Sequence, residues 1–181
     1  MNERIYSCPV ALKLKGRTAF VLWVEPPKGE NYLFKHSGLI FIARSETELR
    51  RRAKTSRAPK VMWKWKSRID LDAFVKQAAR LKAGSFSKPP TCKTLLDGWN
   101  FLEDIARTVN APKNLRIYTK KGPIFKMYDK LFHGNNLRPV TPEGKEYWPI
   151  WTEAELRAFR PALRELTNLL NDRAPELYAA S

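Results

Sequence analysis

The hydrophobic and polar positions of residues 91–109 predict one amphipathic helix. Apolar residues recur along it at spacings of three and four: Leu95, Trp99, Leu102, Ala106 and Val109. A second stripe with the same period is polar: Asp97, Asn100, Asp104 and Arg107. Asn and Asp lower helix propensity, so they are often tolerated where tertiary structure uses their side chains. We expect this helix to be central to the core and its polar stripe to brace neighbouring structure or face solvent.

The first 43 residues have the alternation and the β-branched and aromatic content of strands. The predicted strands cover residues 10–15, 17–25, 32–37 and 39–43, with turns at Gly16 and at Ser37-Gly38. An antiparallel meander follows from this order. Two continuous apolar runs, 19–24 and 39–43, predict that parts of the sheet are covered on both faces.

Capping boxes mark two further helices, because Ser or Thr followed three residues later by Glu can satisfy free backbone N–H groups. Ser45 with Glu48 predicts a helix over 46–53, and Thr152 with Glu155 predicts one that Pro161 kinks or divides. Additional helices are expected to begin at Ile69-Asp70, with Asp70 as N-cap, and at Gly122-Pro123. Short strands are expected at 61–66 and 114–120, and a hairpin near 142–144.

These elements predict the α+β class, an antiparallel β-sheet (the N-terminal meander) packed with several α-helices. The length of 181 residues suits a single α+β domain. We expect residues 1–68 to be mostly β and strongly basic, and residues 69–181 to be mostly helical.

The formal net charge of +16 is distributed unevenly along the chain. Residues 1–68 carry sixteen Lys and Arg against five Asp and Glu, whereas residues 141–181 carry five against seven. A lopsided positive field attracts polyanions, which include nucleic acid, an anionic membrane surface and an acidic protein.

Several cellular locations are disfavoured by the sequence. The longest apolar runs are far too short to span a bilayer, and the first fifteen residues lack a charged region followed by an apolar one. Two cysteines do not form a disulfide framework. We therefore expect a reduced, cytoplasmic protein without a membrane partner.

Residues 50–68 are the clearest candidate for partner binding, because nine of these nineteen residues are Lys or Arg and none is acidic. The candidate contacts are Arg50, Arg51, Arg52, Arg57, Lys60, Lys64, Lys66 and Arg68. They could contact phosphates or an acidic protein, or they could form a solvated edge that discourages strand pairing. Trp63 and Trp65 could stack on bases, but large alternating aromatics usually mark a buried face, so we place both in the core.

No residue pattern makes a positive case for catalysis. His36, His133, Cys8 and Cys92 are scattered, so we expect no metal site, and no phosphate-binding glycine loop or hydrolase motif occurs. Cys92 lies near a helix N-terminus, which could favour thiolate, although a small buried apolar residue is the preferred interpretation. His133 is expected to bond the carbonyls at the end of a helix. Two pairs of carboxylates could act together, Asp97 with Asp104 and Glu103 with Glu153, but the sequence does not show whether either pair is close in space. We expect no catalytic residue, no cofactor, no small-molecule substrate and no enzymatic activity.

Several segments in this order resemble the immunity proteins of bacterial contact-dependent growth inhibition and related polymorphic toxin systems. The segments are 17–43, SETEL (45–49), IDLDAF (69–74), TCKTLLDGWNFLEDIA (91–106) and IWTEAELRAF (150–159). Trp99, Asn100 and Asp104 form the most distinctive pattern among them. The resemblance implies a cytosolic protein that binds its cognate toxin domain in a tight non-covalent complex and catalyses nothing.

The basic composition departs from one trend of that family, in which immunity proteins against nucleases tend to be acidic. The resemblance therefore implies a toxin with an acidic contact surface, although an acidic patch near residues 141–181 leaves a nuclease target open. The alternative function is nucleic-acid binding through residues 50–68. We assign Trp99, Asn100 and Asp104 to architecture, Trp99 by packing and the other two by bracing neighbouring loops.

Overall fold

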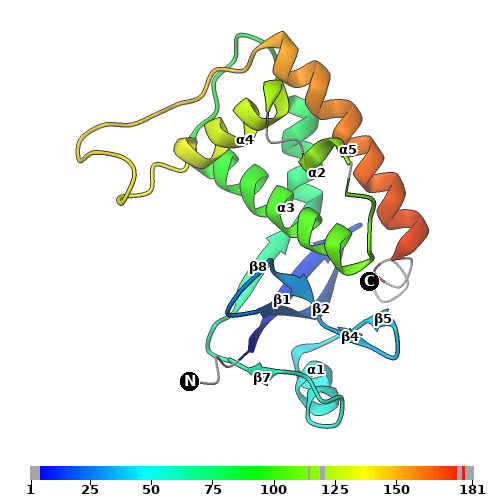
Figure 1. The fold of residues 1–181 in the computed structure, drawn as a ribbon. Coiled ribbons are helices and arrows are strands. Elements are labelled where there is room, and N and C mark those ends of the chain that lie inside the picture. The colour runs from blue at the N-terminus through cyan, green and yellow to red at the C-terminus, as the bar shows by residue number, and fades with distance from the viewer. Residues whose placement is uncertain (1–4, 114, 119–120, 175–176, 178–181) are drawn as a thin grey trace. The chain divides into compact units, whose positions relative to one another are not determined.

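The predicted α+β class is confirmed by the computed structural model, which describes residues 5–113, 115–118, 121–174 and 177 (Figure 1). The chain forms two compact units, each built from separate stretches of sequence. The first unit contains residues 1–72, 104–111 and 169–181, and the second contains 73–103 and 112–168. The expectation of one domain stays a prediction.

Folding redistributes the charge that is uneven along the sequence. The first unit contains eighteen Lys and Arg against ten Asp and Glu, and the second contains sixteen against eight. Both units therefore carry a net charge of +8. The positive charge of residues 1–68 is offset in part, because acidic residues from later segments belong to the same unit.

The sheet of the first unit is built on a long hairpin of β1 (Tyr6–Leu14) and β2 (Arg17–Glu25). The strands β3 (Tyr32–Leu33) and β6 (Ile42–Ala43) both pair antiparallel with β2. The predicted meander is therefore confirmed for β1, β2 and β3, whereas residues 42–43 return to β2 instead of adding the next strand. β4 (Lys35–His36) and β5 (Leu39–Ile40) form a separate hairpin around Ser37-Gly38. β7 (Lys60–Val61) and β8 (Ser67–Asp70) add to β1 in parallel, so the sheet is mixed rather than antiparallel throughout.

The turn between β1 and β2 shows why this hairpin has its register. Lys15 and Gly16 have φ values of 50° and 76°, the combination of a two-residue type I′ turn. Their backbone N–H groups donate to the carboxylate of Asp72 over 2.7 and 2.8 Å. This carboxylate stabilises a backbone conformation that a lysine rarely adopts. Asp70 is the last residue of β8 and directly precedes the helix Leu71–Arg80, so its role as N-cap stays a prediction, and its carboxylate pairs with Lys13 at 3.3 Å.

Helix α1 (Glu46–Ala53) covers part of one face of the sheet. Its capping box is confirmed in modified form: Glu48 N–H donates to Ser45 Oγ, while the Glu48 carboxylate accepts from Arg44 N–H rather than from Ser45. Leu49 is fully buried and packs in a cluster with Leu22, Phe41 and Ala43. Val21 and Leu22, which are neighbours in β2, are both fully buried, so both faces of the sheet are covered there.

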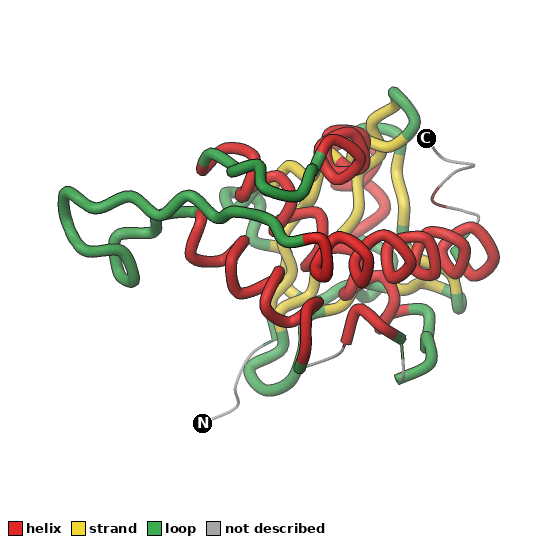
Figure 2. The backbone as a smooth tube through the Cα atoms, turned by 90° about the horizontal axis from the view of Figure 1, so that it is seen from above, coloured by secondary structure: helices red, strands yellow, loops and turns green. Residues whose placement is uncertain are grey.

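The remaining helices are α2 (Leu71–Arg80), α3 (Pro89–Thr108), α4 (Gly122–Gly134) and α5 (Glu153–Arg173). They are labelled in Figure 1, and Figure 2 shows the helices in red. In the second unit, Trp99 stacks on Phe159 with ring centroids 5.2 Å apart. A Cβ atom at Gly98 would lie 2.5 Å from the Phe74 ring, so only glycine allows this approach.

Two expectations for this half of the chain are wrong, namely the strand at 114–120 and the hairpin near 142–144. Residues 116–118, expected in a strand, form a short 3-10 helix, while 114 and 119–120 lie outside the described residues. Helix α5 contains Pro161 and does not divide there, so of the two expected outcomes the kink stays a prediction. Residues 142–145 form a turn, in which Lys145 N–H donates to Pro142 O, but no hairpin of strands forms there.

Candidate partner-binding surface

The basic stretch 50–68 folds so that its second half lies against α1. The guanidinium of Arg50 lies 4.2 Å from the centroid of the Trp63 ring and pairs with Glu46 at 2.6 Å. Lys66 binds the other oxygen of the same carboxylate at 2.8 Å. Hydrogen bonds from Lys66 and Arg50 lower the pKa of Glu46. Two of the eight candidate cations are therefore already paired within the chain.

Arg52 is also engaged inside the first unit. Its guanidinium donates to the carbonyl of Ile42, pairs with Glu48 at 3.2 Å and lies 4.7 Å above the Phe41 ring. These contacts join α1 to β6. A side chain with this many internal partners braces the fold, so Arg52 has little capacity left for a partner.

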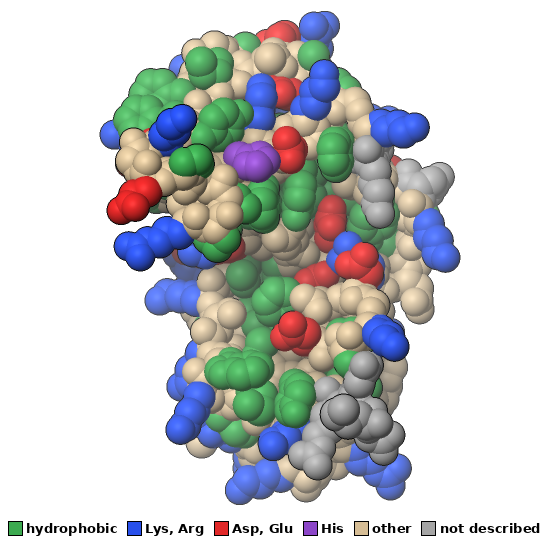
Figure 3. Space-filling view, turned by 60° about the vertical axis from the view of Figure 1, so that its left-hand side comes forward, with side chains coloured by type: hydrophobic (Ala, Val, Ile, Leu, Met, Phe, Trp, Pro, Cys, Tyr) green, Lys and Arg blue, Asp and Glu red, His purple; other side chains and the backbone are tan. Residues whose placement is uncertain are grey.

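Four of the eight candidate cations have exposed side chains that form no ion pair or hydrogen bond with any residue the structure describes. We call them the open cations: Arg51, Arg57, Lys64 and Arg68. Lys60 is also exposed, and its ammonium group lies 6.0 Å above the Tyr6 ring. Figure 3 shows one face of the molecule, with Lys and Arg side chains around much of its outline. Exposed like charges repel one another, so a binder of opposite charge would relieve this repulsion.

The two tryptophans of this stretch have different environments, which corrects the expected strand at 61–66. Only Lys60–Val61 is in a strand, and a turn follows, in which Trp65 N–H donates to Met62 O over 2.9 Å. Trp63 is half-buried against the Leu49 cluster. Trp65 is 58% exposed between two lysines, so its placement in the core was wrong.

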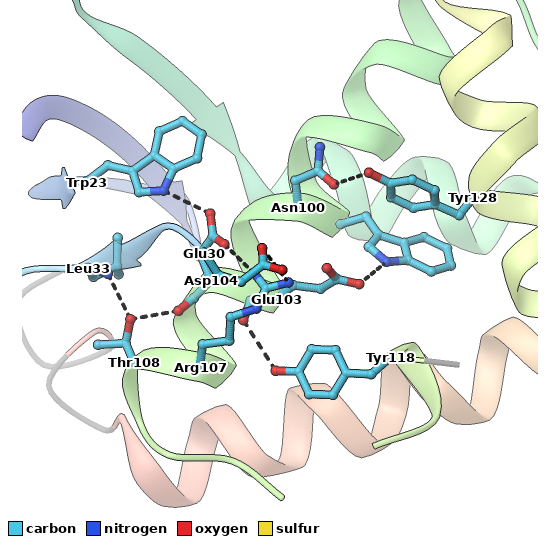
Figure 4. Close-up of polar contacts among 11 residues, drawn as sticks. Trp23, Glu30, Leu33, Asn100, Glu103, Asp104, Arg107, Thr108, Tyr118 and Tyr128 are labelled. Atoms are coloured by element: carbon cyan, nitrogen blue, oxygen red, sulfur yellow. Dashed lines mark hydrogen bonds and ion pairs between the residues drawn. The ribbon is translucent and has the colours of Figure 1, made fainter. Parts of the chain in front are cut away.

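The polar stripe of α3 is bonded to neighbouring structure in both units (Figure 4). In the first unit, Asp104 is only 4% exposed and accepts hydrogen bonds from Trp23 Nε1 at 2.8 Å and from Arg107 at 2.5 Å. The Thr108 hydroxyl bonds the carbonyl of Asp104 and accepts from Leu33 N–H. These bonds join the last turns of α3 to β2 and β3.

In the second unit, Asn100 of the stripe bonds to α4, and its neighbour Glu103 bonds to Trp99 and to the 3-10 helix. Asn100 Oδ1 accepts from the Tyr128 hydroxyl at 2.9 Å, and Trp99 Nε1 donates to Glu103 at 2.8 Å. The Tyr118 hydroxyl donates to the Glu103 carbonyl. Contacts of this kind are what an architectural role requires, and the assignment of Trp99, Asn100 and Asp104 to that role stays a prediction.

Two of the scattered titratable residues, Cys92 and His133, lie in different environments. Cys92 is fully buried, as preferred from the sequence, and burial raises its pKa to about 11, so the thiol is protonated at neutral pH. His133 is exposed, and the carbonyls at the end of α4 are bonded by Asn135 instead. Across the described residues, no three His, Cys, Asp or Glu side chains are grouped so that they could hold a metal ion.

The carboxylates suggested as pairs each have other partners. Asp97 binds Lys93 at 2.6 Å, Glu103 binds Trp99, and Glu153 lies 4.0 Å from Arg157. Within the described part of the chain, no helix is both long and apolar enough to cross a membrane. Comparison of the chain with protein-family models, with curated proteins and with solved structures finds no match.

Proposed function

We propose that this chain is a cytoplasmic immunity protein, which binds a cognate toxin domain in a tight one-to-one complex and catalyses nothing itself. The order of segments that resembles such proteins supports this function. The observation that carries it in the structure is the set of open cations, since these four exposed charges lack partners among the described residues while a bonded framework holds their segment in place.

The ion pairs within the basic stretch reduce the number of residues that we propose as toxin contacts. Arg50, Arg52 and Lys66 hold α1 and the following turn, so they act by positioning. The open cations, together with the exposed indole of Trp65, are the groups available to a toxin. Trp and Arg are enriched among residues that dominate protein interfaces, and this combination suits a partner with an acidic surface.

The test uses a catalytically inactive form of the toxin domain, which the proposal expects to be encoded beside this chain's gene. We expect the double variant Arg51→Glu/Lys64→Glu to associate about tenfold more slowly at low salt, because charge reversal removes electrostatic steering. The matched control is Lys76→Glu/Lys126→Glu, which makes the same charge change at exposed positions of the second unit. Equal association rates for both double variants would remove the basic stretch from the interface.

Nucleic-acid binding is the second candidate, and the exposed Trp65 between Lys64 and Lys66 is the observation that favours it. Single-stranded nucleic acids bind to surfaces that combine aromatic stacking with cations. A gel shift with a single-stranded oligonucleotide should then show binding that weakens steeply with salt and is lost in Trp65→Ala. No shift at low salt would exclude this candidate.

A further inference from the structure

Three large apolar side chains are exposed together on the second unit, where the segment 84–87 meets the end of the loop between α4 and α5. We call them the aromatic patch: Phe86, Trp148 and Ile150, which are 54%, 42% and 59% exposed. The loop, residues 135–152, extends away from the helices of its unit (Figures 1 and 2). Loops of this length without secondary structure are uncommon in compact folds and are usually functional when ordered.

Backbone pairing gives the patch its form. Ser87 N–H donates to Pro149 O over 3.1 Å, Trp151 N–H donates to Ser85 O over 3.1 Å, and Phe86 pairs with Ile150 as an isolated β-bridge. Side chains of extended segments alternate between two faces. Trp151 therefore points inward, fully buried with its indole N–H bonded to Ser87 Oγ, while the three patch residues point outward.

A ring stack and a hydrogen bond support the patch. The Phe86 and Trp148 rings are stacked, with centroids 5.3 Å apart and planes 19° from parallel. Lys130 donates to the Ile150 carbonyl over 2.8 Å and pairs with the buried Glu155. A preorganised apolar surface loses little conformational entropy when a partner covers it.

The charges beside the patch indicate the kind of partner. Glu146 accepts from the Trp148 indole at 3.0 Å, which places a carboxylate at the patch edge, and the ammonium group of Lys130 is neutralised by Glu155. An apolar centre with a carboxylate at its edge suits a protein interface, in which charged residues are depleted at the centre and the rim is polar. A second copy of this chain would bring another charge of +16, so the occupant should be a different protein with net negative charge.

We propose that the aromatic patch anchors the toxin domain, by inserting Trp148 and Ile150 into an apolar recess on that protein. This inference rests on the proposed function and adds a second contact surface to it. Interfaces usually concentrate their binding energy in a few buried aromatic and aliphatic anchors, whereas exposed charges act mainly on the association rate. The patch should therefore control dissociation.

The test measures binding of the inactive toxin domain to the full chain and its variants. Trp148→Ala should weaken the Kd by at least about thirtyfold through faster dissociation, and Ile150→Ala by about tenfold. Phe125→Ala is the matched control, because Phe125 is 44% exposed on α4 of the same unit, and it should bind as the wild type does. Unchanged melting temperatures confirm that the variants fold.

Wild-type affinity in both patch variants would overturn the inference while leaving the proposed function intact. Dimerisation of the wild type, or its binding to anionic phosphatidylglycerol vesicles, that Trp148→Ala abolishes would also overturn it, by naming a different occupant. If the wild-type chain does not bind the toxin domain, the proposed function fails and the inference falls with it.

Discussion

Glu155 should stabilise the second unit more than any exposed acidic residue near it. Its carboxylate is only 4% exposed, pairs with Lys130 at 2.7 Å and accepts from the Thr152 N–H at 2.7 Å. Its own N–H donates to Thr152 Oγ1, which completes the predicted capping box. The Glu155 side chain therefore caps the start of α5 and also binds Lys130, which donates to the Ile150 carbonyl.

The substitution Glu155→Gln removes the charge and keeps the size. A Gln can still complete the capping box, so the stability that the variant loses comes mainly from the charge-assisted bonds between Glu155 and Lys130. Hydrogen bonds to charged groups contribute about 1.5–3 kcal/mol, and Lys130 is partly exposed, so we expect a loss of about 2–3 kcal/mol in the free energy of unfolding. For a chain of this size that lowers the Tm by about 4–12 °C.

The pH dependence of this loss has a definite sign. Burial raises the pKa of Glu155, but hydrogen bonds from Lys130 and Thr152 outweigh it, and the pKa ends below its ordinary value. A lowered pKa in the folded state contributes stability above the unfolded pKa, which is lost as pH falls through the folded value. The Tm difference between wild type and Glu155→Gln should hold from pH 7 to about pH 5 and shrink below about pH 4.

Thermal unfolding followed by circular dichroism measures both effects. Glu153→Gln is the matched control, because Glu153 begins the same helix, is exposed and lies 4.0 Å from Arg157. It should change the Tm by no more than about 2 °C. A Glu155→Gln variant with the Tm of the wild type, or a difference that persists unchanged at pH 3, would refute the reasoning.

Three further predictions concern single side chains. Asn100→Ala should lower the Tm, because the Tyr128 hydroxyl loses its acceptor, and a variant of normal Tm that fails only to bind the toxin domain would place Asn100 in the interface instead. Arg52→Met should cost about 1–3 kcal/mol in urea unfolding, whereas Arg51→Met should cost less than about 0.5 kcal/mol; equal losses would contradict the bracing role of Arg52. Cys92 should resist a thiol reagent in the folded chain at neutral pH, and rapid labelling without denaturant would show that it is accessible.

Local signals in the sequence predicted local structure well. Gly16 marked the tight turn between β1 and β2, and Ser45 and Thr152 marked the starts of α1 and α5 correctly. The period of residues 91–109 predicted α3, which begins two residues earlier than expected. In each case the deciding interactions lie within a few residues of one another, so they can be inferred from spacing.

Features that depend on distant partners could not be predicted in this way. The alternation around Trp63 and Trp65 satisfied the strand pattern. However, β1 pairs with Lys60–Val61, which precede these tryptophans, and with Ser67–Asp70, which follow them, so the residues between the two short strands form a turn. Trp65 is exposed for that reason. Pairing partners of parallel strands are distant in sequence, and no local pattern specifies them.

The same limit applies to the candidate contacts. Charge alone could not separate Arg52, which is bonded to Ile42 and Glu48, from Arg51, which is exposed beside it in the sequence. The aromatic patch was also missed, although residues 148–151 form a short continuous apolar run, which is consistent with an extended segment covered on one face. Its exposure depends on pairing with residues 85–87, more than sixty positions earlier.

The association of the wild-type chain with the inactive toxin domain, measured across a range of salt concentrations, tests the central claim most directly. We predict a saturable one-to-one complex whose association rate falls by at least about tenfold between low and high salt, because a strongly positive protein steers the encounter with an acidic partner. No complex at micromolar concentrations of both proteins, or a rate that salt leaves unchanged, would contradict the account.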